Sequence, residues 1–284
     1  MGLDLLPFEP EFVKNGNVPD ALDLSAIPPL LAEAGEIALR YFRTQLVADD
    51  KGGVHGYDPV TAADRGIEAL LRGRLHDLYG DHEIVGEETG TSGSPGRYRW
   101  LIDPIDGTKA FVTGSPLWGV LLGLVADGVP VAGWMHQPYI GETFGASDGE
   151  ATLTRIDATP VRRLETRRGV DLADAAMYTT FPGMFTDVRD REAFDRLFDS
   201  VRLARFGGDC YAYCQLALGL VDLVVEASLQ PYDIVALIPI VEAAGGVVTG
   251  RHGESAADGG FVVAAGSPEV HAQALAVLNS GAPS

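Results

Sequence analysis

The stretch Trp100-Leu101-Ile102-Asp103-Pro104-Ile105-Asp106-Gly107-Thr108-Lys109-Ala110-Phe111 brings an apolar run directly to an acidic residue. The run Trp100–Ile102 predicts a buried strand with Asp103 at its end. Pro104 has no N–H to donate to a strand ladder, so we expect the strand to stop there. The sequence therefore delivers one carboxylate to the edge of a sheet.

The residues after this strand add further ligands in a small volume. Asp106 supplies a second carboxylate, Gly107 permits a tight turn and Thr108 begins a short helical pattern. The Ile105 carbonyl is left without a ladder partner. Carboxylate and carbonyl oxygens suit Mg²⁺, and amides at the start of a helix suit a phosphate. The loop predicts metal-assisted phosphate chemistry.

Composition limits the classes of protein and partner. The chain has 284 residues, 46% of them hydrophobic, which is enough for one large domain or two small ones. Its net charge of −19 argues against nucleic acid as a partner. An acidic protein that binds a phosphate ester needs divalent cations in between, although acidic surfaces also serve solubility alone.

Targeting signals and disulfides are not evident. Cys210 and Cys214 are the only cysteines, and their spacing in an apolar helical pattern predicts buried thiols. The first residues lack the basic and long apolar regions of a signal peptide, and no apolar run reaches membrane-spanning length. We expect a cytoplasmic protein without a membrane partner.

The first half of the chain predicts helices followed by a largely antiparallel sheet. An apolar stripe from Leu30 to Tyr41 predicts one helix, and Thr61 with Asp64 forms a capping-box pattern before a second. Runs at 118–126, 129–136, 141–146 and 150–154 predict strands. We expect a hairpin or loop at 91–97 and a loop-rich segment at 157–172, and place a boundary between halves 1–165 and 166–284 within one compact unit.

Acidic residues recur where elements begin or end. Glu87 follows a short strand with Glu88, Asp209 lies in the first turn of a helix, and Glu226 ends a strand. Asp233 opens an apolar helix over 234–244. Each has a simpler alternative: a solvated pair for Glu87–Glu88, and favourable helix-end charges for Asp209 and Asp233. The role of Lys51 stays open, because it lies in a glycine-rich loop. The role of Asp58 also stays open, because the capping box of Thr61 and Asp64 does not require a second acid.

These acids would repel one another if they converged. Two like charges 4 Å apart repel by about 4 kcal/mol at an effective dielectric constant near 20. Two Mg²⁺ ions would neutralise four carboxylates and still attract a phosphate.

At this point the chain resembles the inositol monophosphatase superfamily of metal-dependent phosphomonoesterases. The matching residues appear in the family's order over most of the chain: Asp58-Pro59-Val60-Thr61-Ala62-Ala63-Asp64, Gly86-Glu87-Glu88, Trp100–Thr108, Tyr232-Asp233 and Glu242-Ala243-Ala244-Gly245-Gly246. The resemblance implies an α/β fold, a layered αβαβα sandwich, and a homodimer. It also implies inhibition by Li⁺.

The resemblance implies a role for each matching residue. Two or three Mg²⁺ ions per site would be held by carboxylates and one carbonyl, with Asp103 shared: Glu87, Asp103, Ile105, Asp106 and Asp233. Glu87 and Thr108 would orient the attacking water, and Asp64 would hydrogen-bond Thr108. The amides of Gly107 and Thr108 would bind the phosphate.

Two further segments resemble the histidinol-phosphate phosphatase branch of this family. They are 204–213 and 221–233, where inositol-specific members carry a small apolar residue in place of Asp209 and a Trp in place of Tyr232. An acid at Asp209 near Glu226 suits a cationic substrate such as L-histidinol phosphate. Inositol-1-phosphate, a broader range of sugar phosphates or nucleotides, and a catalytically silent metal-binding protein are the alternatives.

Overall fold

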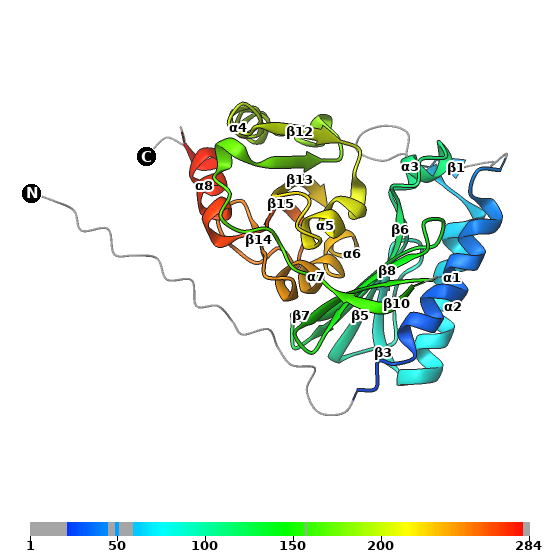
Figure 1. Cartoon of the computed structure of the whole chain (residues 1–284). Coiled ribbons are helices and arrows are strands. Elements are labelled where there is room, and N and C mark those ends of the chain that lie inside the picture. The colour runs from blue at the N-terminus through cyan, green and yellow to red at the C-terminus, as the bar shows by residue number, and fades with distance from the viewer. Residues whose placement is uncertain (1–21, 45–48, 51–58, 157, 281–284) are drawn as a thin grey trace, which may run out of the picture.

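A computed structural model describes residues 22–44, 49–50, 59–156 and 158–280, with two sheets and helices between and around them (Figure 1). The order of strands in the larger, eight-stranded sheet is β10 (Ala158–Arg163), β9 (Glu150–Arg155), β8 (Glu142–Ser147), β7 (Val129–Gln137), β6 (Gly119–Ala126), β5 (Ser94–Asp106), β3 (His82–Gly86) and β4 (Gly90–Ser92). Only β3 and β5 run parallel in this sheet, so the predicted antiparallel character is confirmed.

The smaller sheet belongs to the second half of the chain. Its five strands, in spatial order, are β12 (Leu203–Phe206), β11 (Ala176–Thr179), β13 (Leu223–Leu229), β15 (Gly260–Ala265) and β14 (Val247–Gly250). β11 pairs in parallel with both of its neighbours, whereas β13, β15 and β14 are antiparallel. A short pair, β1 (Asp49–Asp50) and β2 (Pro59–Val60), is separate from both sheets.

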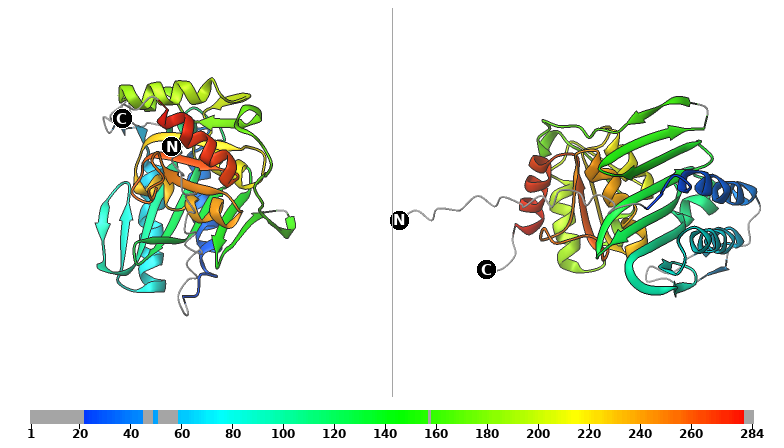
Figure 2. Two further views of the ribbon diagram at one scale, coloured as in Figure 1. Left: turned by 90° about the vertical axis from the view of Figure 1, so that its left-hand side faces the viewer. Right: turned by 90° about the horizontal axis from the view of Figure 1, so that it is seen from below.

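The helices complete five layers, as Figures 1 and 2 show. They are α1 (Ile27–Tyr41), α2 (Ala62–Tyr79), α3 (Thr108–Val112), α4 (Val188–Phe198), α5 (Asp209–Ala217), α6 (Pro231–Ile234), α7 (Leu237–Ala243) and α8 (Pro268–Asn279). α1 and α2 cover one face of the larger sheet; α5 and α7 lie between the sheets; α4 and α8 cover the smaller sheet. The αβαβα sandwich is confirmed, while the division at residue 165 stays a prediction.

Burial of apolar faces explains these layers. Leu31, Ile67 and Trp100 are fully buried between α1, α2 and the larger sheet, as their helical and strand spacing predicted. Every residue of β6 is buried, because helices cover both of its faces. None of the described helices is long and apolar enough to cross a bilayer.

The loop alternative for 91–97 is wrong, and so is the loop predicted over 158–163, because both segments contain strands. Residues 94–97 extend β5 beyond the predicted start of the strand, and β10 occupies 158–163 at the edge of the larger sheet. Residues 94–97 and 161–163 are exposed, and neither segment has the apolar alternation that marks a half-buried strand. Two short 3₁₀ turns, Leu172–Asp174 and Pro182–Met184, also precede and follow β11.

The expected end of the central strand at Pro104 is also corrected. β5 continues to Asp106, but its register against β6 shifts between Asp103 and Asp106. Pro104 falls in this irregularity, where a missing N–H costs no ladder hydrogen bond. The bulge turns Asp103 and Asp106 into the same region instead of leaving them on opposite faces.

Candidate active site

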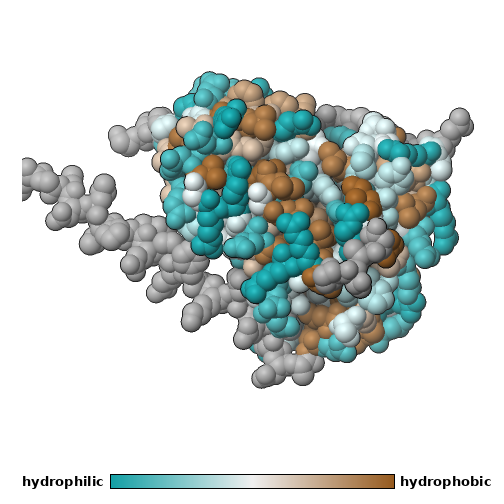
Figure 3. Space-filling view, viewed as in Figure 1, coloured by the Kyte–Doolittle hydropathy of each residue, from teal (hydrophilic) through white to brown (hydrophobic). Residues whose placement is uncertain are grey.

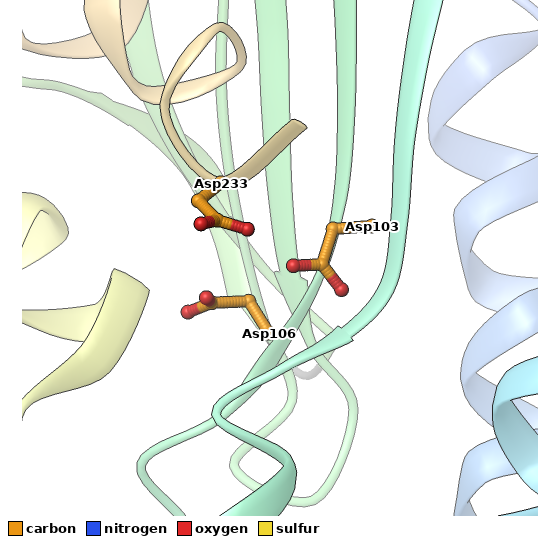
Figure 4. A group of neighbouring side chains, drawn as sticks. All are labelled: Asp103, Asp106 and Asp233. Carbon is orange, nitrogen blue, oxygen red and sulfur yellow. The ribbon is translucent and has the colours of Figure 1, made fainter. Parts of the chain in front are cut away.

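Two aspartates of β5 and a third from a distant part of the chain meet at the end of this strand. One carboxylate oxygen from each of Asp103, Asp106 and Asp233 lies within 4.8 Å of the others. Figure 4 shows Asp103 and Asp106 on the β5 segment and Asp233 approaching from α6. Pro231 occupies the first turn of α6 and Asp233 is its third residue, so a capping box fixes the third carboxylate.

Backbone amides hold these carboxylates in place. Asp103 Oδ1 accepts a hydrogen bond from the Ile105 amide at 3.0 Å, and Asp106 Oδ2 accepts one from the Cys210 amide at 2.7 Å. Asp233 Oδ2 accepts from the Gln230 amide at 2.7 Å. Each donor uses one carboxylate oxygen, so further lone pairs face the centre of the cluster.

The cluster is electrostatically unfavourable without a cation. Burial raises the pKa of Asp103 well above its ordinary value, and the charges of Glu87, Asp106 and Asp233 raise it further. Burial followed by the charge of Asp106 has the same effect on the pKa of Asp233. Burial also raises the pKa of Asp106, although its hydrogen bonds with Cys210 oppose the shift.

Glu87 reaches this cluster from the turn between β3 and β4. Its amide donates to the Ile102 carbonyl at 3.2 Å, which ties the turn to β5. Its half-buried side chain hydrogen-bonds that of Asp103. The strand-end placement predicted for Glu87 is therefore observed, and the solvated-surface alternative fails for this residue.

The Ile105 carbonyl and Thr108 lie on the same loop. Thr108 Oγ1 donates to the Ile105 carbonyl at 3.0 Å, which leaves that oxygen one lone pair for a ligand. Gly107 has a φ of +82°, a conformation that favours glycine. A Cβ there would lie 3.0 Å from the Leu117 carbonyl and 3.1 Å from Asp209 Cβ, so the loop packs tightly against the start of α5.

Asp64 forms the predicted capping box at the start of α2. Its Oδ2 accepts from the Thr61 amide at 2.8 Å and from the Thr61 hydroxyl at 2.5 Å. The strand β2 immediately before it packs against α3, the helix that Thr108 begins. The hydrogen bond between Asp64 and Thr108 stays a prediction. Lys51 and Asp58 lie outside the described residues.

Asp209 and Glu226 line a pocket beside the aspartate cluster. The pocket contains about 310 Å³ of empty space, open to solvent, and its walls also include Asp106 and Asp233. Burial raises the pKa of Asp209 well above its ordinary value, with further contributions from Asp106 and Glu226. Asp209 also has a φ of +44°, an uncommon conformation for a residue with a side chain.

Glu226 has two hydrogen-bond donors that the sequence did not reveal. The Thr180 amide donates to Oε1 and the Tyr213 hydroxyl to Oε2, both at 3.0 Å. Thr180 Oγ1 accepts from the Asp209 amide at 3.0 Å, so one residue connects both acids. The one available signal was the position of Tyr213, one helical turn after Asp209.

Comparison with known proteins identifies the family to which the chain belongs. The sequence pattern of the inositol monophosphatase family matches residues 24–281. The chain belongs to the inositol monophosphatase family. It is a phosphatase of this metal-dependent family, and its acidic cluster consists of the hard oxygen ligands that a divalent cation requires.

Relatives within the inositol monophosphatase family carry several activities. The chain is 38% identical over 266 residues to the bifunctional phosphatase IMPL2 of Arabidopsis thaliana, covering 89% of this chain and 74% of that protein. It is 35% identical over 224 residues to a histidinol-phosphatase of Mycobacterium tuberculosis, covering 78% and 85% respectively. A solved inositol monophosphatase from Zymomonas mobilis has a TM-score of 0.79 and 34% identity, covering 90% of this chain and 97% of that one.

Proposed function

We propose that this protein is a Mg²⁺-dependent L-histidinol-phosphate phosphatase of histidine biosynthesis. The observation that carries the proposal is the acidic wall formed by Asp209 and Glu226 next to the aspartate cluster. A phosphate ester bound at the cluster would place the rest of the substrate against this wall. L-Histidinol phosphate carries an ammonium and an imidazole, both of which suit carboxylates.

The residues that would hold two or three Mg²⁺ ions fit that cation. Asp103, Asp106 and Asp233 offer converging carboxylates, while Glu87 and the Ile105 carbonyl complete an all-oxygen set. When bound, Mg²⁺ neutralises charge on the phosphoryl group and makes a coordinated water a stronger nucleophile.

The chain itself would supply orientation. Glu87 and Thr108 would position the attacking water, and Asp64 would fix Thr108 from behind. The amides of Gly107 and Thr108 would bind the phosphate oxygens, since successive amides around a left-handed residue such as Gly107 can form an anion-binding concavity. Holding nucleophile and ester in one geometry lowers the entropic part of the barrier.

Asp209 is the better candidate for direct contact with the cationic group. Both oxygens of Glu226 already accept hydrogen bonds, and burial raises the pKa of Glu226 to about 7 even though those bonds oppose the shift. The side chain of Asp209 borders the pocket, and Lys109 is near enough to lower its pKa slightly. Glu226 would then fix the orientation of Asp209 through Thr180.

Phosphate release with Mg²⁺ from L-histidinol phosphate and from inositol-1-phosphate tests the substrate. We expect a higher kcat/KM for L-histidinol phosphate. Asp209→Asn should lower that kcat/KM about tenfold, the cost of a charge-assisted hydrogen bond, and change the value for inositol-1-phosphate less than threefold. Asp148→Asn is a matched control, because Asp148 also has a positive φ but lies on an exposed hairpin.

Four outcomes would reject this substrate or this role. A kcat/KM that favours inositol-1-phosphate would select that activity, which the Zymomonas mobilis structure makes the main alternative. Broad turnover of sugar phosphates or nucleotides would indicate a general phosphatase. Absence of turnover with every ester would indicate a silent metal-binding protein, and equal losses from Asp209→Asn on both substrates would remove its role in specificity.

The same proposal includes a homodimer and inhibition by Li⁺. Exposed hydrophobic side chains gather on α4 and the edge strand β12, and Figure 3 shows hydrophobic residues at the upper edge of the molecule, where Figure 1 places these elements. They are Val188, Phe198, Leu203 and Phe206, between 39% and 71% exposed. Light scattering should give a molar mass twice that of the chain. Leu203→Lys should lower this mass toward that of a single chain.

A further inference from the structure

One buried carboxylate outside the aspartate cluster holds the turn that carries Glu87. Glu68 lies on α2 with a side chain that is 0% exposed. It accepts hydrogen bonds from the Glu88 amide at 2.7 Å and from the Thr89 amide at 3.0 Å, and also from the Thr89 hydroxyl. Both amides belong to the turn in which Glu87 is the first residue.

The space for this carboxylate is created by a glycine. A Cβ on Gly86 would lie 2.5 Å from Glu68 Oε1, a separation that atoms do not tolerate. The strand β3 therefore ends in a residue without a side chain because the Glu68 carboxylate occupies that position. The contact is tight enough to transmit a displacement of Glu68 to the turn.

Arg72 neutralises Glu68 and fastens both strands beside the turn. Its Nε lies 2.8 Å from Glu68 Oε1, one helical turn away. Its guanidinium also donates to the Ile84 carbonyl of β3 at 3.3 Å and to Ser92 Oγ of β4 at 2.6 Å, and to the Gly90 carbonyl. Four of the five guanidinium N–H groups of Arg72 thus have an acceptor, which lowers the cost of burying the ion pair.

We infer that Glu68 is a positioning residue that sets the affinity of the site for its divalent cation through Glu87. Glu87 is fixed on one side by the bond from its amide to Ile102 in β5, and its turn is fixed on the other side by Glu68 on α2. Residues that orient metal ligands without touching the metal commonly change its affinity 10- to 100-fold. This inference rests on the proposed metal-dependent phosphatase.

The test compares Glu68→Gln with Glu83→Gln. A glutamine at 68 keeps the size of the side chain but brings an NH₂ group toward the amides of Glu88 and Thr89. Glu83 is a matched control, because it is another nearly buried acid, on β3, that pairs with Arg99 at 2.5 Å. We expect the half-saturating Mg²⁺ concentration to rise about tenfold for Glu68→Gln and to stay within twofold for Glu83→Gln.

Three measurements separate positioning from a purely structural role. Titration calorimetry with Mg²⁺ alone should give the same tenfold loss without any substrate, thermal unfolding reports the stability of each variant, and KM for the ester at saturating Mg²⁺ should not change. A folded Glu68→Gln protein with the wild-type Mg²⁺ dependence would overturn the inference. A wild-type protein that neither binds Mg²⁺ nor releases phosphate would instead reject the proposed function.

Gly86→Ala tests the contact between Gly86 and the Glu68 carboxylate by changing the glycine instead of the acid. It replaces the first test if Glu68→Gln does not fold. We expect its methyl group to displace the Glu68 carboxylate and to weaken Mg²⁺ binding about tenfold. In a Glu68→Ala background the methyl group has room, so Gly86→Ala should cause no further loss. Losses in Mg²⁺ affinity that multiply in the double variant would show that Gly86 acts independently of Glu68 and would overturn the inference.

Discussion

Two sets of acids in this protein differ in their partners. Outside the aspartate cluster, four of them pair with arginines: Glu68 with Arg72, Glu83 with Arg99, Glu142 with Arg155 and Asp222 with Arg167. Within the described part of the chain, no Lys or Arg forms an ion pair with Asp103, Asp106 or Asp233.

This difference locates the place where the fold requires a cation from outside. An arginine partner removes most of the electrostatic cost of a buried acid, and its hydrogen bonds fix the orientation of the carboxylate. The three aspartates accept hydrogen bonds from backbone amides, which hold them in place without neutralising them. Stability and function are therefore served by different acids, and substitutions should have opposite effects in the two groups.

The largest expected effect comes from Asp103→Asn. Asp103 contacts the other acids of the cluster, and an amide there is a poor ligand for a hard cation. We expect kcat for phosphate release to fall about 10³-fold, or about 4 kcal/mol. In EDTA the same variant should melt at a higher temperature than the wild type, because one repelling charge has been removed.

The opposing signs are the decisive part of this experiment. Phosphate release measures kcat, and calorimetric melting in EDTA and in excess Mg²⁺ measures the melting temperature of the same samples. An Asp103→Asn protein that loses activity and also melts at a lower temperature in EDTA would place Asp103 among the structural acids. The division into two groups would then be wrong.

Stability as a function of pH tests the whole cluster at once. Burial raises the pKa of Glu226 from 4.5 to about 7 and raises the pKa values of Asp103, Asp209 and Asp233. The folded chain therefore binds these protons more tightly than the unfolded chain. The contribution of Glu226 to stability is complete below pH 4.5 and is lost as the pH rises through about 7. The contributions of the three aspartates are lost in the same direction, as the pH rises.

In EDTA, the free energy of unfolding should fall between pH 5 and pH 8 by about 3 kcal/mol for the Glu226 shift alone. Saturating Mg²⁺ should reduce the part of the slope that comes from the aspartates, because bound cations favour their ionised form. Urea unfolding at several pH values measures both curves. Parallel curves with and without Mg²⁺ would mean that the cation does not bind at these acids.

Much of the cluster could be predicted from local sequence. The apolar run before Asp103, the turn at Gly107 and the proline before Asp233 each fix a backbone position within a few residues. Thr61 and Asp64 satisfied a complete local rule, and their capping box is present. These signals need no knowledge of the rest of the fold.

The remaining features depend on contacts between distant segments. Thr180 and Tyr213 become part of the pocket only because β11, α5 and β13 come together. The helix predicted over 234–244 is instead two helices, interrupted at Val235–Ala236, where Gly123 and Gly133 of the larger sheet approach the backbone. A Cβ on Gly133 would lie 2.0 Å from the Ala236 carbonyl oxygen, a close approach that no local pattern reveals.

The smallest expected effect comes from an arginine-paired acid far from the cluster. Asp222 is 1% exposed at its side chain, accepts from the Ala176 amide at 2.7 Å and pairs with both ends of the Arg167 guanidinium. Asp222→Asn should lower the free energy of unfolding by about 2 kcal/mol. This lies between the values for buried and for exposed pairs, because Arg167 is 45% exposed.

This loss should be the same in EDTA and in Mg²⁺, with kcat and the half-saturating Mg²⁺ concentration unchanged. Asp222 already has a guanidinium as its permanent counterion, so a divalent cation has nothing to neutralise there. Urea unfolding with and without Mg²⁺ checks the first statement, and phosphate release checks the second. A loss of stability that disappears in Mg²⁺ would show that Asp222 is coupled to the aspartate cluster. The arginine-paired acids and the cation-binding acids would then not be separate sets.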